Sequence, residues 1–394
     1  MIRHGKLPVR RPWVSGVLAG AAALAVLLVS GTSIAAIAVA SISDRVQTVS
    51  LDPGVSGSAS PTAATFEGAA DIVIVGSDSR ADQTEGVDEG DPGTLNNDVT
   101  MVVHISADHA QMTAVSIPRD LVTTLPSCRN TDTGAIEPEE RGMFNEALER
   151  GGADGGLACV TRSVQQLLGI TPGYAGLIKF DGVAQMADAV GGVTVCVATA
   201  IHDPYVGLDL DAGEHLLTGR DASRYLRSRH GTVDGSDLSR ISNQQVFLSA
   251  LVRKVTAPGG ALSNPLTMYK LARAASANMT LSDSMRRVDT IVGLGGTLRG
   301  MDLSDVLFVQ YPTIEDPLDR NRLVADDTAA PVLAAALQND TRTTLDSGDD
   351  TTAAPSTGAT TTPGSSGTAE ATPTALPTGI SGQSAADQTC AEGG

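Results

Sequence analysis

A long uncharged run near the N-terminus constrains this chain more than any other stretch. The run extends from Trp13 to Ser43 and follows a basic segment that contains Arg3, Lys6, Arg10 and Arg11. It is longer than the ~20 apolar residues that cross a bilayer as a helix. Because basic residues favour the cytoplasmic side, the pattern predicts a cytoplasmic segment (1–12), a single transmembrane anchor (13–43) and an extracytoplasmic remainder held at the cell membrane.

A cleaved signal peptide is the alternative reading of the same run. Ala38-Val39-Ala40 resembles a signal cleavage site. The apolar run nevertheless exceeds the ~7 to 15 residues that are usual in a signal peptide, so its length favours the uncleaved anchor.

Composition divides the rest of the chain into four parts. Residues 44–70 are rich in Ser, Gly, Pro and Ala, which predicts a flexible spacer. Residues 71–339 carry the periodic apolar patterns of a folded domain, whereas 340–380 are mainly Thr, Ala, Pro, Gly and Ser and are predicted to be disordered. A short tail, 381–394, contains one cysteine.

Within the folded part, strands and helices alternate. Short apolar runs with branched residues predict strands; these are residues 71–75, 99–105, 112–117, 177–180, 193–197 and 306–311. Helical periodicity or helix end signals predict helices; these are 144–168, 182–189, a short helix after Thr218, 241–255, 266–277, 281–294 and 330–337.

Arginines gather in one stretch of an otherwise acidic protein. The stretch Tyr225–Gln245 contains Arg227, Arg229 and Arg240, although the chain has 45 acidic residues against 27 basic ones. The planar donor fork of arginine matches phosphate oxygens two at a time and keeps its charge. The stretch therefore indicates an anion site, with a solvated basic face as the plainer alternative. The net charge of −18 argues against general nucleic-acid binding, which needs a broad basic surface.

Two aspartates lie where a predicted strand ends and the next one starts. Asp78 follows the run 71–75, and Asp98 opens the following strand. If the two strands are antiparallel neighbours, these carboxylates meet at one end of the sheet and need a cation between them. Magnesium, which accepts one or two carboxylates and leaves positions for phosphate oxygens, is the natural ion. Turn formation by aspartate is the plainer explanation.

Four cysteines in an extracytoplasmic chain predict disulfides. Three connectivities are possible. Cys128 and Cys159 flank a loop-like stretch that their pairing would restrain, and Cys196 would then pair with Cys390. The spacings do not match those of a zinc site.

Several stretches, in order, resemble the LytR-CpsA-Psr family of cell-wall phosphotransferases. They are IVGSDSR (74–80), NDVTMVVHI (97–105), VSIPRD (115–120), FNEALERGG (144–152), IKFDGVAQMADAVGGVTV (178–195), LDLDAGEHLLTGRDASRYLRSRH (208–230) and DLSRISNQQ (237–245). The anchor and the C-terminal cysteine after a Thr/Pro-rich stretch resemble actinobacterial members. The resemblance implies a single α/β domain, with a mostly antiparallel or mixed central sheet flanked by helices.

For the site, the resemblance implies specific roles. Asp78 and Asp98 would hold magnesium or manganese, and the pyrophosphate of the donor would be bound by Arg119, Arg227, Arg229 and Gln244, with Arg80 and Arg240 supporting the site. Of these, Arg80, Arg119, Arg227 and Arg229 are the expected catalytic residues. Asp120 is expected to orient Arg119.

The implied reaction transfers a polyprenyl-pyrophosphate-linked glycopolymer to peptidoglycan and forms a phosphodiester. A non-catalytic receptor for polyprenyl phosphate or glycan is one alternative, and a pyrophosphatase that releases the lipid-linked polymer is another. Four positions depart from the family pattern: Asn96, Val99, Met143 and Asn243 stand where arginine, threonine, lysine and arginine are usual.

Overall fold

The computed structural model describes most of the predicted folded domain. The described residues are 47–51, 68–77, 95–231, 237–260, 264–286, 288–345, 374–377 and 380–393. They all belong to the second of two compact units, residues 1–45 and 46–394. Within these ranges no helix has both the length and the apolarity needed to span a membrane. The predicted anchor, 13–43, lies outside the described residues.

A mixed sheet forms the centre of the described domain. Its eight strands among the described residues have the order β1-β14-β9-β2-β3-β4-β15-β20. Their bounds are β1 (Gln47–Val49), β2 (Ala70–Ser77), β3 (Asn97–Ile105), β4 (Met112–Ile117), β9 (Tyr174–Lys179), β14 (Met279–Ser282), β15 (Val306–Gln310) and β20 (Gly382–Ser384). Strand β3 is antiparallel to β2 and β4, whereas β2 pairs in parallel with β9, and β4 with β15. The predicted α/β fold with a mixed sheet is confirmed.

This topology brings several strand ends to one edge. Because β3 runs against its neighbours, its amino end lies beside the carboxyl ends of β2 and β4. Ser77 pairs with Asn97, and Thr100 with Ile117. The first two strands are therefore antiparallel neighbours, the condition under which Asp78 and Asp98 were expected to meet, and the residues that directly precede them in sequence are paired partners.

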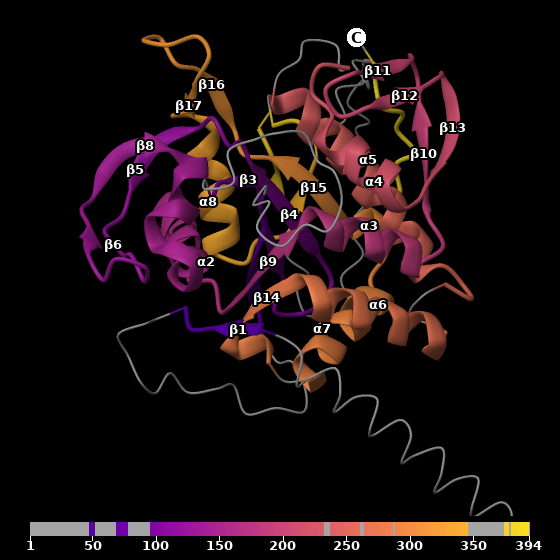
Figure 1. Cartoon of the computed structure of the whole chain (residues 1–394), viewed down its shortest axis with the longest axis horizontal. Coiled ribbons are helices and arrows are strands. Elements are labelled where there is room, and N and C mark those ends of the chain that lie inside the picture. Colours follow the sequence, from indigo (N-terminus) through magenta and orange to yellow (C-terminus); the bar gives the residue numbers. More distant parts are fainter. Residues whose placement is uncertain are drawn as a thin grey trace, which may run out of the picture. The chain divides into compact units, whose positions relative to one another are not determined.

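Helices cover both faces of the sheet (Figure 1). On one face α2 (Ala147–Leu168) and α8 (Ala329–Gln338) pack on a core that includes Val73 and Val75. On the other, α5 (Asp237–Thr256) and α7 (Val288–Gly300) pack on Ile72 and Met101. Alternate residues of one strand thus face opposite layers, as the two-residue period of a strand requires.

A third core lies beside the sheet and carries the arginine stretch. It joins α3 (Phe180–Ala189), α4 (Gly219–Arg227), the inner face of α5 and small two-stranded sheets. The strands of those sheets are β10 (Val193–Val197) with β13 (Gly213–Leu217), and β11 (Ile201–Asp203) with β12 (Leu208–Leu210). Tyr225 of α4 is fully buried there and packs near the ring of Phe247.

One predicted helix is partly wrong. Residues 281–294 were expected to be helical, but Met279–Ser282 forms β14, which directly follows α6 (Pro265–Asn278), and the helix α7 begins only at Val288. Strand β14 pairs with β9 on one side and β1 on the other. Sheet hydrogen bonds formed with distant strands therefore outweigh the local helical pattern, which contained no signal of these partners.

Both ends of the described chain belong to the sheet. The sequence placed residues 47–49 in a flexible spacer and 382–384 in a separate tail, yet these residues form β1 and β20, the two outer strands.

Cys128 pairs with Cys159 and Cys196 with Cys390, as predicted. The C-terminal segment is held further by Arg253, which donates to the carbonyls of Ala385 and Asp387. Most of the predicted linker, 340–380, lies outside the described residues.

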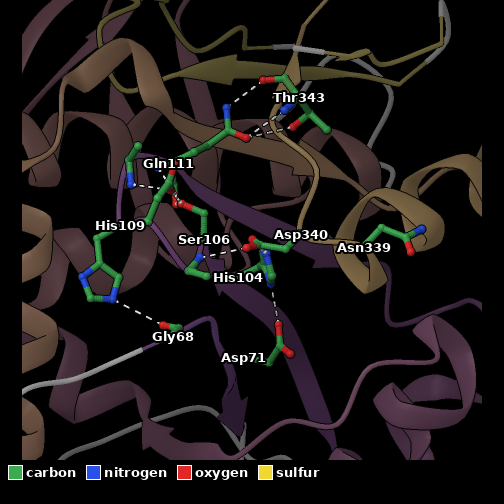
Figure 2. Close-up of polar contacts among 12 residues, drawn as sticks. Gly68, Asp71, His104, Ser106, His109, Gln111, Asn339, Asp340 and Thr343 are labelled. Carbon is green, nitrogen blue, oxygen red and sulfur yellow. Dashed lines mark hydrogen bonds and ion pairs between the residues drawn. The ribbon is translucent and has the colours of Figure 1, made fainter. Parts of the chain in front are cut away.

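A histidine bound by two carboxylates ties the chain after α8 to the sheet (Figure 2). Buried His104 of β3 contacts Asp71 through Nδ1 at 2.8 Å and Asp340 through Nε2 at 3.0 Å. The second oxygen of Asp340 accepts a hydrogen bond from the backbone N–H of Ala107. Burial lowers the pKa of His104, but hydrogen bonds and charge from Asp71 and Asp340 outweigh it, so the pKa is raised.

This raised pKa predicts a stability contribution that depends on pH. It should be fully present below the pKa of the unfolded histidine, about 6.5, and lost as the pH rises through the higher folded value. We expect the difference in unfolding free energy between wild type and His104→Gln to shrink as the pH is raised from about 6 to about 9. Chemical denaturation across this range measures it. Exposed His202 provides the control, His202→Gln, and a His104 difference that is constant with pH would contradict the prediction.

Candidate active site

The candidate site lies at the sheet edge where β2 and β4 end and β3 begins. Arg119 follows β4, and its Nη1 donates to Oδ1 of Asp98, the second residue of β3, at 2.6 Å. The backbone of Arg119 is held from two sides: its N–H donates to Oδ2 of Asp237 and its carbonyl accepts from the N–H of Asn145. The predicted proximity of Arg119 and Asp98 is thus confirmed.

Asp237 and Arg240 bring the first turn of α5 to the same place. The two side chains are buried and form an ion pair at 2.5 Å, three residues apart on the helix. Nη2 of Arg240 also donates to the backbone carbonyl of Asp98 at 2.6 Å. Arg240 therefore fixes the start of β3, while Asp237 joins α5 to the loop after β4.

Asp120 links two further arginines to the cluster. Its carboxylate lies 3.7 Å from Nε of Arg119, 3.8 Å from Nη2 of Arg229 and 3.3 Å from Nη1 of Arg322. Asp120 thus lies close to Arg119, the residue that it was expected to orient. Arg322, which belongs to a loop between β16 (Thr313–Glu315) and β17 (Leu323–Ala325), was not foreseen, because nothing in the sequence connects it with this site.

Arg227 and Arg229 come from the end of α4 and the chain that follows it, and Arg229 lies 3.8 Å from Asp120. Arg227 is the last residue of the helix, and Ser228 has an extended backbone with φ −60° and ψ 132°. The chain thus leaves the helix between the two arginines, so they share neither one helix face nor one strand.

The charges of the cluster indicate a place for an anion. Four arginines (Arg119, Arg229, Arg240 and Arg322) are connected through three aspartates (Asp98, Asp120 and Asp237). Burial, together with the charges of Arg119 and Arg240, lowers the pKa of Arg229. The pKa of Arg119 is raised, because its aspartates outweigh its burial. Repulsion between guanidinium groups would be relieved by a bound phosphate, whose oxygens accept charge-assisted hydrogen bonds.

Two buried hydrogen-bond donors also favour a bound anion. Within the described part of the chain, the Nε atoms of Arg119 and Arg240 are buried without a hydrogen-bond partner. Leaving such a donor unsatisfied costs free energy, so a ligand that accepts from it binds more tightly. A pyrophosphate offers several acceptor oxygens for this purpose.

Gln244, which the resemblance assigned to the pyrophosphate, lies against the end of α4, which carries Arg227. It is buried, and its Nε2 donates to the carbonyl of Leu226 at 3.1 Å. In this structure it therefore supports the end of α4 rather than presenting its amide to the arginine cluster. Asn243, one of the four departures from the family pattern, is also buried on α5.

The metal site is described only in part. Asp98 is at the cluster, whereas Asp78 and Arg80 lie outside the described residues. No group of three or more metal-ligating side chains occurs in the described ranges. Magnesium needs only one or two carboxylates when phosphate and water complete its coordination, so the hard oxygen of Asp98 beside an anion site fits this ion in donor type.

Two buried carboxylates were missed by the sequence analysis. Asp237 was recognised only within the matched stretch 237–245, although its spacing to Arg240 suited an ion pair within one helix. Asp203, at the end of β11, is completely buried and accepts hydrogen bonds from Ser228 and from the N–H groups of Arg229 and His230. It thereby fixes the backbone that carries Arg229. Because the chain is rich in aspartate, nothing in the sequence around Asp203 distinguished it from the other aspartates.

Comparisons with known proteins agree with this fold. Residues 33–336 match the LytR_cpsA_psr family. The cell wall biosynthesis protein LcpA of Corynebacterium glutamicum is 33% identical over 266 residues, which are 62% of this chain and 50% of LcpA. The chain therefore spans about half the length of this curated relative.

Two solved structures share the architecture. The LytR-Csp2A-Psr enzyme from Actinomyces oris has a TM-score of 0.52 and 21% identity, covering 74% of this chain and 96% of its own. TagT bound to LI-WTA has a TM-score of 0.50 and 18% identity, covering 75% of this chain and 98% of its own. At these identities the likeness shows the fold.

Proposed function

Because this chain belongs to the LytR-CpsA-Psr family, we propose that it is a phosphotransferase that attaches a polyprenyl-pyrophosphate-linked glycopolymer to peptidoglycan. The name of LcpA, a cell wall biosynthesis protein, and that of the Actinomyces oris enzyme support a catalytic role in cell-wall assembly. TagT was solved with LI-WTA bound, which supports a polymer donor. The observation that carries the proposal is the arginine cluster, with its buried and unsatisfied Nε donors.

In the proposed reaction an acceptor hydroxyl of peptidoglycan attacks the phosphorus that carries the glycopolymer. A bond forms between the hydroxyl oxygen and this phosphorus, and the bond from the phosphorus to the bridging oxygen breaks. Polyprenyl phosphate leaves with the bridging oxygen, and the hydroxyl proton passes to a base or to solvent. The product is a phosphodiester.

The residues of the site act on the charge that this reaction moves. Arg119 and Arg229 neutralise the oxygens of the pyrophosphate, and preorganised positive charge stabilises the transition state more than water does. Asp237 and Arg240 hold the loop after β4 and the start of β3 in place. Asp98, together with Asp78, would hold magnesium or manganese, which supplies further positive charge to the phosphate oxygens when bound.

We also propose a location for each part of the chain. Residues 13–43 would anchor the protein in the cell membrane, with 1–12 in the cytoplasm and the catalytic domain outside. The domain bounds predicted from composition, 71–339, need to include the outer strands β1 and β20, because both complete the sheet.

The test uses the full chain in detergent with a synthetic polyprenyl-pyrophosphate glycan, with and without magnesium. Wild type should release polyprenyl phosphate in a metal-dependent manner, and Asp98→Ala and Arg227→Ala should lose this activity by roughly a hundredfold or more. Asp108→Ala is the matched control, because this exposed carboxylate lies in the turn between β3 and β4, at the opposite edge of the sheet. Added peptidoglycan separates transfer from hydrolysis. Tight binding of the donor without turnover, whichever acceptor is added, would exclude an enzymatic function and favour the non-catalytic receptor.

A further inference from the structure

Two exposed aromatic rings extend from the backbone next to Arg229. Tyr205, in the turn between β11 and β12, has 68% of its surface exposed, and His230 is exposed in the loop after α4. Their ring centroids lie 4.0 Å apart, with planes inclined by 31°. Aromatic residues make up only 3% of this chain. Packing in the core does not explain a ring that is mostly in solvent, so the stacked pair requires another account.

One buried carboxylate holds both halves of this pair. Oδ1 of Asp203 accepts from the backbone N–H of Tyr205 at 3.0 Å, and Oδ2 accepts from that of His230, also at 3.0 Å. The same Oδ2 accepts from the N–H of Arg229 at 2.9 Å. Although burial raises the pKa of Asp203, these hydrogen bonds outweigh it and lower the pKa, so the carboxylate stays ionised.

The contacts of Asp203 therefore join the aromatic pair to the anion site. His230 directly follows Arg229, whose guanidinium lies 3.8 Å from Asp120. The backbone groups of Tyr205, Arg229 and His230 are thus held together by one buried carboxylate. The rings therefore extend from backbone that lies next to that of Arg229.

We propose that the Tyr205–His230 pair binds the sugar ring that is bonded directly to the pyrophosphate of the donor. The inference rests on the proposed function and names the part of the substrate that this surface recognises. In a glycosyl pyrophosphate the first sugar is attached to a phosphate oxygen, so phosphates in the arginine cluster bring that ring next to the pair. The C–H face of a pyranose packs against the electron-rich face of an aromatic ring, and its hydroxyls bond to polar neighbours.

The surroundings of the pair suit a carbohydrate better than a protein partner. His202 and Asp209 lie on the same hairpin with side chains that are 71% and 83% exposed, and they contact each other at 3.4 Å. They add exposed hydrogen-bonding groups to the hairpin that carries Tyr205. Protein interfaces are built around larger apolar patches than two rings provide.

The test compares two probes that differ only in the sugar. One is farnesyl pyrophosphate, and the other carries one N-acetylglucosamine on its terminal phosphate. With the full chain in detergent, titration calorimetry should show tighter binding of the glycosylated probe by wild type. Tyr205→Ala should weaken binding of that probe roughly three- to tenfold and leave binding of farnesyl pyrophosphate unchanged, whereas Tyr205→Phe keeps the ring and the affinity.

Nuclear magnetic resonance provides a readout that a purely structural role would not affect. Stacking on an aromatic face shifts the C–H protons of the sugar upfield by ring currents, and Tyr205→Ala should remove this shift. Equal affinity of wild type for both probes, or an equal loss for both in Tyr205→Ala, would overturn the sugar site alone. Failure of wild type to bind either probe would overturn the proposed function and the sugar site with it.

Discussion

Arg119→Lys is expected to reduce the release of polyprenyl phosphate by roughly a hundredfold or more, although it preserves the charge. Arg119 is the centre of the cluster: its guanidinium contacts Asp98 at 2.6 Å and lies 3.8 Å from Asp237. A lysine ammonium is a point charge that cannot bind Asp98 and phosphate oxygens with a planar fork at the same time. Steady-state kinetics with the polyprenyl-pyrophosphate glycan measure the loss, which should fall mainly on kcat.

The matched control is Arg342→Lys. Arg342 follows α8, pairs with Asp305 at 2.8 Å, and is about as exposed as Arg119, with 27% against 22% of its side chain accessible. We expect this variant to keep wild-type activity. Thermal unfolding of both variants separates lost chemistry from lost folding. An Arg119→Lys enzyme with nearly normal kcat would show that charge alone suffices and that the donor fork has no role.

Removal of residues 380–394 is expected to have the largest effect on stability. The Cys196–Cys390 disulfide closes a loop of 194 residues, and loss of such a cross-link costs roughly 5 kcal/mol in the chain-entropy model. The truncation also removes β20 from the sheet and the carbonyl groups that Arg253 binds. Because the unfolding free energy of a domain is ~5–15 kcal/mol, we expect a mostly unfolded or aggregating protein.

The double variant Cys196→Ala with Cys390→Ala isolates the disulfide from the strand. It should lower the unfolding midpoint in denaturant but leave a folded protein, because β20 still pairs with β15. Circular dichroism and urea titration measure both changes. A truncated protein that unfolds at the wild-type midpoint would refute the view that the C-terminal segment is part of the folding unit.

The sequence predicted the inner strands well because their signals are local. Met112–Ile117 was predicted with the bounds that β4 has, since a buried apolar run is followed directly by Pro118. The outer strands were missed for the opposite reason. The residues of β20, Gly382–Ser384, carry no apolar pattern, and their backbone pairing with β15 supplies the structure.

The residues of the candidate site also divide into those that the sequence signals and those that only the tertiary structure reveals. Arg240 was predicted because arginines in an acidic chain are conspicuous, and Arg119 because of the family resemblance; the structure brings both together with Asp98. Apart from a local bond from the N–H of Tyr205, Asp203 accepts hydrogen bonds from the Ser228 hydroxyl and from the N–H groups of Arg229 and His230, which follow it by 25 or more positions. Such a role depends on the tertiary arrangement alone, so no spacing rule would have found it.

The two outer strands of the sheet, β1 and β20, come from segments that are far in sequence from the strands they pair with, and this affects the folding pathway. Thr280 of β14 and Gln47 of β1 are 233 positions apart. Strand β20 pairs with β15 although the predicted linker, 340–380, separates the two strands in sequence. Contacts between residues so far apart in sequence form slowly. A folding intermediate in which β14, β9, β2, β3, β4 and β15 have assembled, but the outer strands β1 and β20 have not docked, presents open backbone edges to other chains. Aggregation during refolding should therefore compete with the docking of these two short strands, and it should increase with protein concentration.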